Sequence, residues 1–532
     1  MGGRKPVVRF DEKAIARLFA ALDQDRLPGV AVGVALDGKP VWRAGFGLAH
    51  MELPVSLSPT IRMRIGSVSK HFTALAYMLL CEEGRASVDD PVGYYLPELH
   101  PIARRITARQ LMAHINGLRD VCAIKLDFSG LDTGRVTSGD LMSLYRTIED
   151  VTAAPGTIWI YNNGGYFILS EMIERISGQP LEEVLRRRIF EPAGMKDTLL
   201  RRWDTDFVPN SATPHMTRRG GGWMLANYGM DNFSGGGAIV STVDDMLRWL
   251  AHMEAPTVGR AATWAAMQTP HVLPNGASTE YGFGLCVTRY RGIDLVYHSG
   301  GGIGCNAAMM KAPGAGLDIA IMANRDDVSA TQLAFDVLCT CLPELGAGLP
   351  RQAHPPAIGT FCSPATGRVI QLMGKDGRQI VSIDGNDLPF EWDEDGVLRP
   401  AVTVRHFGGA LTLLGNPERP ESLRLDDFGH LDDLVSMRPG DADAGSIAGR
   451  YRSEATDTDA VVTVTGAGAR LSTVGRFGAA EFTMECIGPR VWRPSTTGPW
   501  QRYGSVLTFD ADGAGFRFSN WSLRGLPFRR RA

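Results

Sequence analysis

The sequence has few lysines, no long apolar run and none of three common catalytic or cofactor motifs. Only eight of its 55 lysines and arginines are lysine, and no segment approaches ~18 uninterrupted apolar residues, the length of a membrane-spanning helix. The motifs HExxH, the Walker phosphate loop and GxSxG are absent. We therefore expect no membrane span and none of the chemistries that these motifs support.

The net charge, the cysteines and the N-terminal stretch limit which binding partners and which cellular compartment we expect. The net charge is −3 with no long block of one sign, so we expect neither a nucleic acid nor a membrane surface as partner. The eight cysteines contain no CxxC pair, which predicts free thiols and no metal site or disulfide framework. The N-terminal stretch carries scattered charges in place of an apolar signal core, which predicts a cytoplasmic location.

The 532 residues are too many for a single hydrophobic core, and the composition changes near residue 345. Helical and strand patterns are mixed up to that point, which predicts a domain of α and β structure over 1–345. A stretch rich in Pro and Gly then predicts a linker over 346–357. Short alternating runs follow, with a weak repeat between "IGTFCS" and "IAGRYRS", and they predict two antiparallel β-barrels over 358–440 and 445–532.

The stretch "IGSVSKHFT" (65–73) holds the first candidates for chemistry. Ser67 precedes Lys70 by three residues, which on a helix puts both side chains on one face, and this is the only SxxK in the chain. The apolar run "FTALAYMLL" that follows predicts a buried helix. A buried lysine loses solvation, its pKa falls and it can accept the serine proton, which an arginine cannot do. Taken alone, the motif is also compatible with an exposed polar pair.

Two further stretches supply groups that an acyl-transfer site needs. In "IYNNGGYF" Tyr161 and Asn163 stand just before a predicted helix, where a tyrosine can pass a proton and an asparagine can bind substrate. In "LVYHSGGGIG" a strand with His298 runs into Gly300 and Gly301, whose backbone lets a substrate approach and offers N–H groups to an oxyanion. Taken singly, these stretches are also compatible with a structural tyrosine and with a turn that carries a surface histidine.

In this order, SxxK, YxN and His-x-Gly resemble the active-site signature of the penicillin-recognising serine hydrolases related to class C β-lactamases. The resemblance covers roughly residues 8–340 and implies an antiparallel sheet flanked by helices for the catalytic domain. Four connecting segments are similar to the same family: "LMAHINGLRD" (111–120), "EPAGMKDT" (191–198), "GGGAIVSTVDDMLRW" (235–249) and "YGFGL" (281–285).

Within that family the sequence is most similar to the bacterial D-aminopeptidases, through "MRIGSVSKHFTA", "NGLRD", "YGFGL" and the tandem barrels. The similarity implies a multidomain α+β protein in which two lipocalin-like barrels follow a β-lactamase-like domain. It also implies an enzyme that releases N-terminal D-amino acids from peptides, amides or esters, as a homodimer without a cofactor.

Two features depart from the D-aminopeptidase pattern. Cys286, just after "YGFGL", stands where those enzymes have asparagine, which makes it a substrate-side candidate. The stretch "RVWRPSTTGPWQRYG" (490–504) corresponds to a loop that carries an active-site aspartate in those enzymes, but it is shorter and contains no acid. Its Thr496, Thr497 and Trp500 are the loop candidates for contact with substrate.

The predicted mechanism is an acyl transfer in two steps. Ser67 attacks the substrate carbonyl and Lys70 takes its proton. The N–H groups of Ser67 and Gly301 hold the oxyanion, and Tyr161, tuned by His298, passes a proton to the leaving group. An esterase or amidase, a β-lactamase or a D,D-carboxypeptidase could use the same site, although the last would need an export signal. A non-catalytic binding protein with a degenerate site is the remaining alternative.

Overall fold

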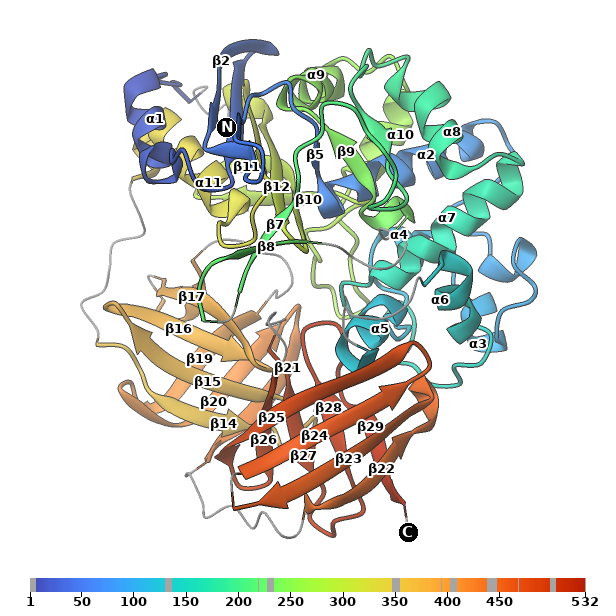
Figure 1. The fold of residues 1–532 in the computed structure, drawn as a ribbon, viewed down its shortest axis with the longest axis vertical. Helices are drawn as coiled ribbons and strands as arrows, with labels where there is room; N and C mark the ends of the chain where they lie inside the picture. The colour runs from blue at the N-terminus through green and yellow to red at the C-terminus, as the bar shows by residue number, and fades with distance from the viewer. Residues whose placement is uncertain are drawn as a thin grey trace. The chain divides into compact units, whose positions relative to one another are not determined.

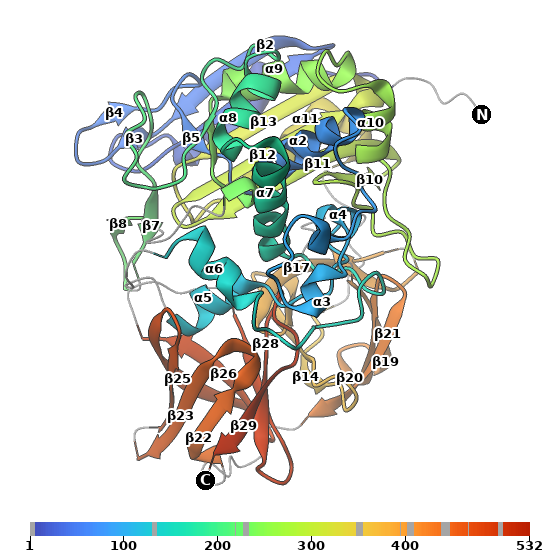
Figure 2. The same ribbon diagram turned by 90° about the vertical axis from the view of Figure 1, so that its right-hand side faces the viewer.

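The computed structural model of the chain describes residues 6–129, 136–218, 220–226, 234–346, 355–393, 395–401, 409–437, 447–466, 468–497 and 504–531 (Figures 1 and 2). It divides into two compact units. The first unit comprises Met1–Ala113, Gly164–Val272 and Ser278–Ala347, and the second comprises His114–Asn163, Leu273–Ala277 and Gly348–Ala532. The sequence predicted segment 114–163 as part of the domain over 1–345, but in the structure this segment belongs to the second unit, with the barrel region.

The first unit is built on a six-stranded antiparallel sheet with the strand order β10-β11-β12-β13-β1-β2 (Figure 1). The neighbouring strands β13 and β1 are buried along almost their whole length and consist largely of β-branched and small residues, which pack well on a pleated surface. The strands are β1 (Val30–Leu36), β2 (Lys39–Phe46), β10 (Cys286–Tyr290), β11 (Ile293–Gly302), β12 (Cys305–Ala312) and β13 (Leu317–Ala323).

Helices pack against this sheet. Helix α9 (Val243–Glu254) contacts β1 and β13, and α11 (Ala330–Cys341) contacts β12 and β13. Gly33 in β1 leaves room for α9, because a Cβ there would lie 2.5 Å from the Val243 side chain. The other helices of this unit are α1 (Glu12–Phe19), α2 (Lys70–Glu82), α3 (Pro101–Arg104), α4 (Ala108–Met112), α7 (Asn163–Ser177), α8 (Leu181–Leu185) and α10 (Ala261–Met267).

Short strands complete the first unit. They form one three-stranded sheet and two two-stranded sheets beside the main sheet. These strands are β3 (Leu48–His50), β4 (Val55–Ser56), β5 (Met63–Arg64), β6 (Leu199–Leu200), β7 (His215–Thr217), β8 (Trp223–Leu225) and β9 (Ile239–Ser241). Across the described part of the chain, every helix is too short or too polar to cross a lipid bilayer.

The second unit contains two closed antiparallel barrels of eight strands each (Figure 2). Pairing of β14 with β21 closes the first barrel, and pairing of β22 with β29 closes the second. Closure removes the free edges that would otherwise pair with other chains. Along β23, residues from Thr458 to Thr463 alternate between buried and exposed, as the pattern in the sequence predicts. The expected tandem of antiparallel barrels is confirmed.

The first barrel consists of β14 (Gly359–Cys362), β15 (Val369–Lys375), β16 (Arg378–Ile383), β17 (Asn386–Trp392), β18 (Leu398–Pro400), β19 (Gly409–Asn416), β20 (Arg419–Asp427) and β21 (His430–Met437). The second consists of β22 (Gly449–Ser453), β23 (Thr458–Thr465), β24 (Gly468–Gly475), β25 (Gly478–Gly488), β26 (Val491–Thr496), β27 (Val506–Phe509), β28 (Gly515–Ser519) and β29 (Leu526–Arg531). Most of the predicted linker, 347–354, and the predicted boundary at 440–445 lie outside the described residues. The domain boundaries stay a prediction.

Segment 114–163 supplies two helices to the second unit, α5 (Val121–Ser129) and α6 (Ser138–Leu144). Every residue of α5 is buried, and the helix contacts β24 and β25 of the second barrel. The ring of Phe128 in α5 lies 4.9 Å from that of Phe518 and 5.5 Å from that of Phe528, both in the barrel. The apolar run of this segment therefore belongs to the packing of the second barrel.

A buried charge network joins the two barrels. Arg368 donates to Asp384 at 3.0 Å and to Asp427 at 2.9 Å in the first barrel, and Arg524 of the second barrel donates to the same oxygen of Asp427 at 2.8 Å. Burial alone would raise the pKa of Asp427, but Arg524 and Arg368 outweigh it, so the pKa lies below its usual value. Asp427 is therefore charged and shared between two arginines.

We expect Asp427→Ala to lower the free energy of unfolding by about 3–5 kcal/mol, because Arg524 loses its buried carboxylate partner and Arg368 keeps only Asp384. Since the pKa of Asp427 is lower folded than unfolded, its contribution is complete above about pH 4 and is lost as the pH falls through the folded pKa. Calorimetric unfolding of the full chain at pH 7 and at lower pH measures both effects.

Asp433→Ala is the matched control for this prediction. Asp433 also pairs with an arginine of the first barrel, Arg424, but both side chains are largely exposed. Its removal should leave the unfolding transition almost unchanged. Equal losses from the two substitutions would show that the buried network does not hold the barrels together.

Candidate active site

Ser67 and Lys70 lie together in the first unit, at the start of α2. Ser67 belongs to a 3₁₀ turn over Gly66–Ser69, and Lys70 is the first residue of the helix. Nζ of Lys70 is 3.0 Å from Oγ of Ser67, and it donates to the carbonyl of Gly236 at 2.7 Å. Side chains three residues apart eclipse each other in a 3₁₀ turn. The SxxK spacing thus brings the two groups into contact although the α-helix begins later than expected.

The surroundings of Lys70 keep water away from its amine. The side chain is 0% exposed, and Nζ lies 5.3 Å from the centroid of the Tyr166 ring in α7. A buried amine depends on protein groups for its hydrogen bonds. The Gly236 carbonyl and the ring face hold the nitrogen beside Ser67.

Strand β11 runs directly against the turn that carries Ser67. A Cβ on Gly300 would lie 1.9 Å from the carbonyl oxygen of Ile65 and 3.3 Å from the backbone nitrogen of Ser67. Gly66 has φ +52°, in the left-handed region, and a Cβ there would lie 2.9 Å from the backbone nitrogen of Gly301. Gly301 itself is exposed, with open space where its Cβ would be. Glycine at positions 66 and 300 lets two backbones touch beside the serine.

His298 is buried in β11 and is bonded to Tyr281. Its Nδ1 lies 2.6 Å from the carbonyl of Ser299, which can only accept, so Nδ1 carries the proton and Nε2 accepts from the Tyr281 hydroxyl at 2.9 Å. The nearby Tyr281 lowers the pKa of Tyr166, but burial outweighs it and raises that pKa, so the phenol stays protonated and donates to the carbonyl of Met112 at 2.9 Å. A row of buried aromatic side chains therefore leads from His298 to the ring beside Lys70.

Sequence reasoning missed the two tyrosines of this row. Tyr281 belongs to "YGFGL", which carried the family resemblance but no assigned role, and Tyr166 belongs to the apolar face of a predicted helix. A buried tyrosine in an apolar pattern gives no local signal of function, because only the partner of its hydroxyl marks it.

Cys286 begins β10 and pairs in register with Tyr297 of β11. It is 4% exposed, and burial raises the pKa of its thiol far above the usual value. The thiol is therefore neutral, and a neutral thiol is a poor nucleophile. The structure thus places Cys286, a candidate for contact with substrate, within the paired strands β10 and β11.

Tyr161 and Asn163 lie in the second unit, on the segment that leads into α7. The ring of Tyr161, which is 3% exposed, lies 4.2 Å from that of His114. The backbone on both sides of Tyr161 is bonded to the same histidine: Ile160 N donates to its carbonyl at 3.0 Å, and Asn162 N donates to its Nδ1 at 3.2 Å. The tyrosine is thus held in a fixed place within its unit.

Asn163 is bonded to Asp120, the last residue of "NGLRD". Its backbone nitrogen donates to Oδ2 of Asp120 at 3.0 Å, and its side-chain amide lies 3.4 Å from the same oxygen. The buried carboxyl group of Asp120 therefore fixes both the backbone and the side chain of Asn163 within the second unit. The role of Asn163 in substrate binding stays a prediction.

The loop candidates fall at the end of β26. Thr496 pairs with Phe482, and Thr497 donates its backbone N–H to the carbonyl of Glu481 at 3.1 Å. Trp500 lies outside the described residues. Thr496 and Thr497 are thus the end of a barrel strand, and their contact with substrate stays a prediction.

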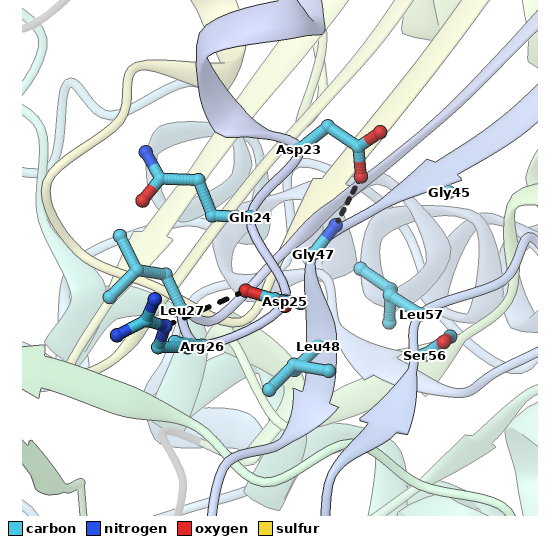
Figure 3. A pocket seen from close by; sticks show the side chains of 10 residues that line it. All are labelled: Asp23, Gln24, Asp25, Arg26, Leu27, Gly45, Gly47, Leu48, Ser56 and Leu57. Atoms are coloured by element: carbon cyan, nitrogen blue, oxygen red, sulfur yellow. Dashed lines mark hydrogen bonds and ion pairs between the residues drawn. The ribbon is translucent and has the colours of Figure 1, made fainter.

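A surface hollow in the first unit contains none of the predicted site residues. Figure 3 shows Asp23 accepting from the backbone N–H of Gly47 and an ion pair between Asp25 and Arg26. The lining consists of Asp23, Gln24, Asp25, Arg26, Leu27, Gly45, Gly47, Leu48, Ser56 and Leu57. Within the described ranges, no cluster of three or more His, Cys, Asp or Glu side chains is placed to share a metal ion.

We expect Gly300→Ala to reduce activity at least about 100-fold, because a displacement near 1 Å at a reacting group can cost that much. The added methyl group would overlap the Ile65 carbonyl and push β11 away from Ser67. Steady-state kinetics on any substrate that the wild-type protein hydrolyses measures the loss.

Gly301→Ala is the control for steric room, because its methyl group would meet open space. It should fold with an unchanged melting temperature. Activity of Gly300→Ala within a few-fold of wild type would contradict the close approach of the two backbones.

Known proteins resemble the chain over most of its length. The family model described as Beta-lactamase matches residues 15–339. A D-aminopeptidase of Brucella melitensis is 27% identical over 526 residues, which cover 94% of this chain and 96% of the relative.

Two solved structures share the fold. The octameric penicillin-binding protein homologue from Pyrococcus abyssi is 21% identical, with a TM-score of 0.58 over 80% of this chain and 100% of its own. The D-amino acid amidase from Ochrobactrum anthropi SV3 is 22% identical, with a TM-score of 0.52 over 63% of this chain and 97% of its own. The predicted family and the predicted fold class are confirmed. Because the family model matches more than half of its residues, the chain belongs to the β-lactamase family.

Proposed function

We propose that this member of the β-lactamase family is a serine hydrolase that releases N-terminal D-amino acids from peptides, amides or esters through an acyl-enzyme. The observation that carries the proposal is the fully buried Lys70, whose amine lies 3.0 Å from the Ser67 hydroxyl. A nucleophile and a base within hydrogen-bond distance are the minimum for covalent acyl transfer. The D-amino acid specificity is supported by the full-length similarity to a D-aminopeptidase at 27% identity.

Acylation begins when Ser67 Oγ attacks the substrate carbonyl and the neutral amine of Lys70 takes its proton. Negative charge then develops on the carbonyl oxygen, and the backbone N–H groups of Ser67 and Gly301 stabilise it. The contact between β11 and the Ser67 turn supports this role, because it keeps the two backbones beside each other. Open space at Gly301 leaves room for a substrate there.

Tyr161 passes the proton to the amine or alcohol that leaves, so the bond to the leaving group breaks and the acyl group stays on Ser67. His298 tunes this relay. Water then attacks the acyl-enzyme, with the same groups taking and returning its proton, and the free amino acid leaves with Ser67 restored. The order of the motifs and the buried, fixed Tyr161 support this assignment.

An esterase or amidase for small acyl groups is the second candidate function. The observation that favours it is the absence of any acid from the stretch 490–504, since a substrate ammonium bound there would lack a carboxylate partner. D,D-carboxypeptidase and β-lactamase activities would use the same serine. A non-catalytic binding protein would not need a lysine buried against a serine.

We further propose that the enzyme works in the cytoplasm as a homodimer, without a cofactor or a nucleic-acid partner. The dimer is supported by the resemblance to the D-aminopeptidases, whereas the related structure from Pyrococcus abyssi is described as octameric. Light scattering coupled to gel filtration distinguishes the two states, because they differ fourfold in mass.

Ser67→Ala should abolish turnover, and Lys70→Arg should lower kcat at least about 1,000-fold, because arginine stays protonated and cannot act as base. Lys196→Arg, at an exposed position, is the matched control and should behave like wild type. Burst kinetics with an activated ester measure the acylation step. Retention of most activity by Lys70→Arg would contradict the role of Lys70 as base.

The substrate class is tested with D- and L-alanine p-nitroanilides, a p-nitrophenyl acyl ester and a chromogenic cephalosporin. We expect the D-anilide to be hydrolysed and the L-anilide to be inert, with Ser67→Ala inactive on both. Hydrolysis of the ester alone would place the protein with the esterases. Equal rates on the two anilides would rule out stereospecificity.

A further inference from the structure

The turn between β28 and β29 is buried in the second unit although it connects two strands. It comprises residues 519–525, "SNWSLRG", which we call the 519–525 turn. Its residues Ser519, Asn520, Ser522 and Leu523 are at most 3% exposed, and Trp521 is 8% exposed. Connections between strands normally lie at the surface, because their backbone groups need water. This turn must therefore satisfy its polar groups within the protein.

Internal hydrogen bonds fix the shape of the 519–525 turn. The side-chain carbonyl of Asn520 accepts from the backbone N–H of Ser522 at 3.0 Å and of Leu523 at 2.8 Å. Asn520 N donates to the carbonyl of Leu523 at 2.8 Å. Gly525 has φ +60°, which favours glycine, and its N–H donates to Ser519 Oγ at 3.0 Å. The turn is rigid because its own atoms satisfy one another.

Three contacts then anchor the turn to the rest of the second unit. The Asn520 amide donates to Asp127 of α5 at 2.8 Å, and Arg119 donates to the carbonyl of Arg524 at 2.6 Å. The guanidinium of Arg524 donates to the buried Asp427 of the first barrel at 2.8 Å. Figures 1 and 2 both show α5 beside the second barrel. The position of the turn is thus set by both barrels and by segment 114–163.

Trp521, at the centre of the turn, packs on Tyr161. The two ring centroids are 5.7 Å apart with an interplanar angle of 45°. The ring of His114 lies 4.2 Å from that of Tyr161, so His114 and Trp521 together confine the phenol ring. Tyr161 itself belongs to a connecting segment and not to a helix or strand. A side chain on a connecting segment needs such packing to keep a defined position.

We propose that Trp521 is the positioning residue of Tyr161, so that the second barrel holds the proton relay of the active site in place. This inference rests on the proposed role of Tyr161 in proton transfer. Proton transfer is efficient only over hydrogen-bond distances, so loss of the packing surface slows the chemical step more than substrate binding. The second barrel then contributes to catalysis through the packing of Trp521 on Tyr161.

A merely structural role for Trp521 predicts a different result. Any large buried side chain of the barrel contributes to stability, so a lower melting temperature alone carries no information about Tyr161. Phe509 is the matched control, because it is buried in the same barrel and its ring contacts are with Tyr451 and Phe516. Phe509→Leu should lower stability and leave kcat unchanged.

The test is a double-mutant cycle in the full chain, with Trp521→Leu, Tyr161→Phe and both together. We expect Trp521→Leu to lower kcat about 10- to 100-fold with KM nearly unchanged, and to have no further effect when Tyr161 is already Phe. The pH profile of kcat should shift in Trp521→Leu and stay unchanged in Phe509→Leu. Trp521→Phe should restore most of kcat, since it keeps an aromatic face.

Unchanged kcat in Trp521→Leu, or an equal loss in the presence and absence of the Tyr161 hydroxyl, would overturn the inference. If Trp521→Leu does not fold, Asn520→Ala takes its place in the cycle with the same expectation, because it removes the bond that ties the turn to Asp127. Full activity of Tyr161→Phe would instead overturn the proposed function. Kinetics of these variants, on whichever ester or anilide the wild type hydrolyses, therefore distinguish failure of the Trp521 inference from failure of the proposed function.

Discussion

The contact between the buried amine of Lys70 and the hydroxyl of Ser67 is the constraint around which the first unit is arranged. Burial removes water from this amine, and the Gly236 carbonyl and the face of the Tyr166 ring are its neighbours instead. Strand β11 also lies against the turn that carries Ser67, which Gly66 and Gly300 allow because neither has a Cβ. Strand β11, the start of α2 and these two glycines therefore meet beside the Ser67–Lys70 contact.

In the second unit, order depends on a few buried polar groups as much as on the barrel cores. Asp427 holds Arg368 and Arg524, Arg524 holds the 519–525 turn, and the turn presents Trp521 to Tyr161. Each of these groups has a partner, which is what makes burial of charge tolerable. The second barrel carries no predicted catalytic residue. It is nevertheless connected in this way to Tyr161, a predicted catalytic residue that stands some 360 residues earlier in the chain.

Much of the architecture could be predicted from patterns in the sequence. Alternating runs with turn residues predicted two antiparallel barrels, and the SxxK, YxN and His-x-Gly motifs predicted the family. The parts that could not be predicted are the partners of individual side chains. Tyr281, His114 and Trp521 sit in segments whose apolar or turn-like pattern is that of ordinary core residues, so nothing local distinguishes them. The grouping of segment 114–163 with the barrels is likewise invisible in its own composition.

The sequence by itself determined which chemical groups are available and how they are spaced along the chain. Examples are the single SxxK, the scarcity of lysine and the glycines after His298. Such patterns can be interpreted without a structure, because a spacing of a few residues decides which side chains are neighbours within one helical turn or one strand. Only the tertiary structure decided which groups are buried and which distant side chains meet. His298 bonds to Tyr281, and Trp521 packs on Tyr161, because burial and ring contacts depend on how separate segments fold together.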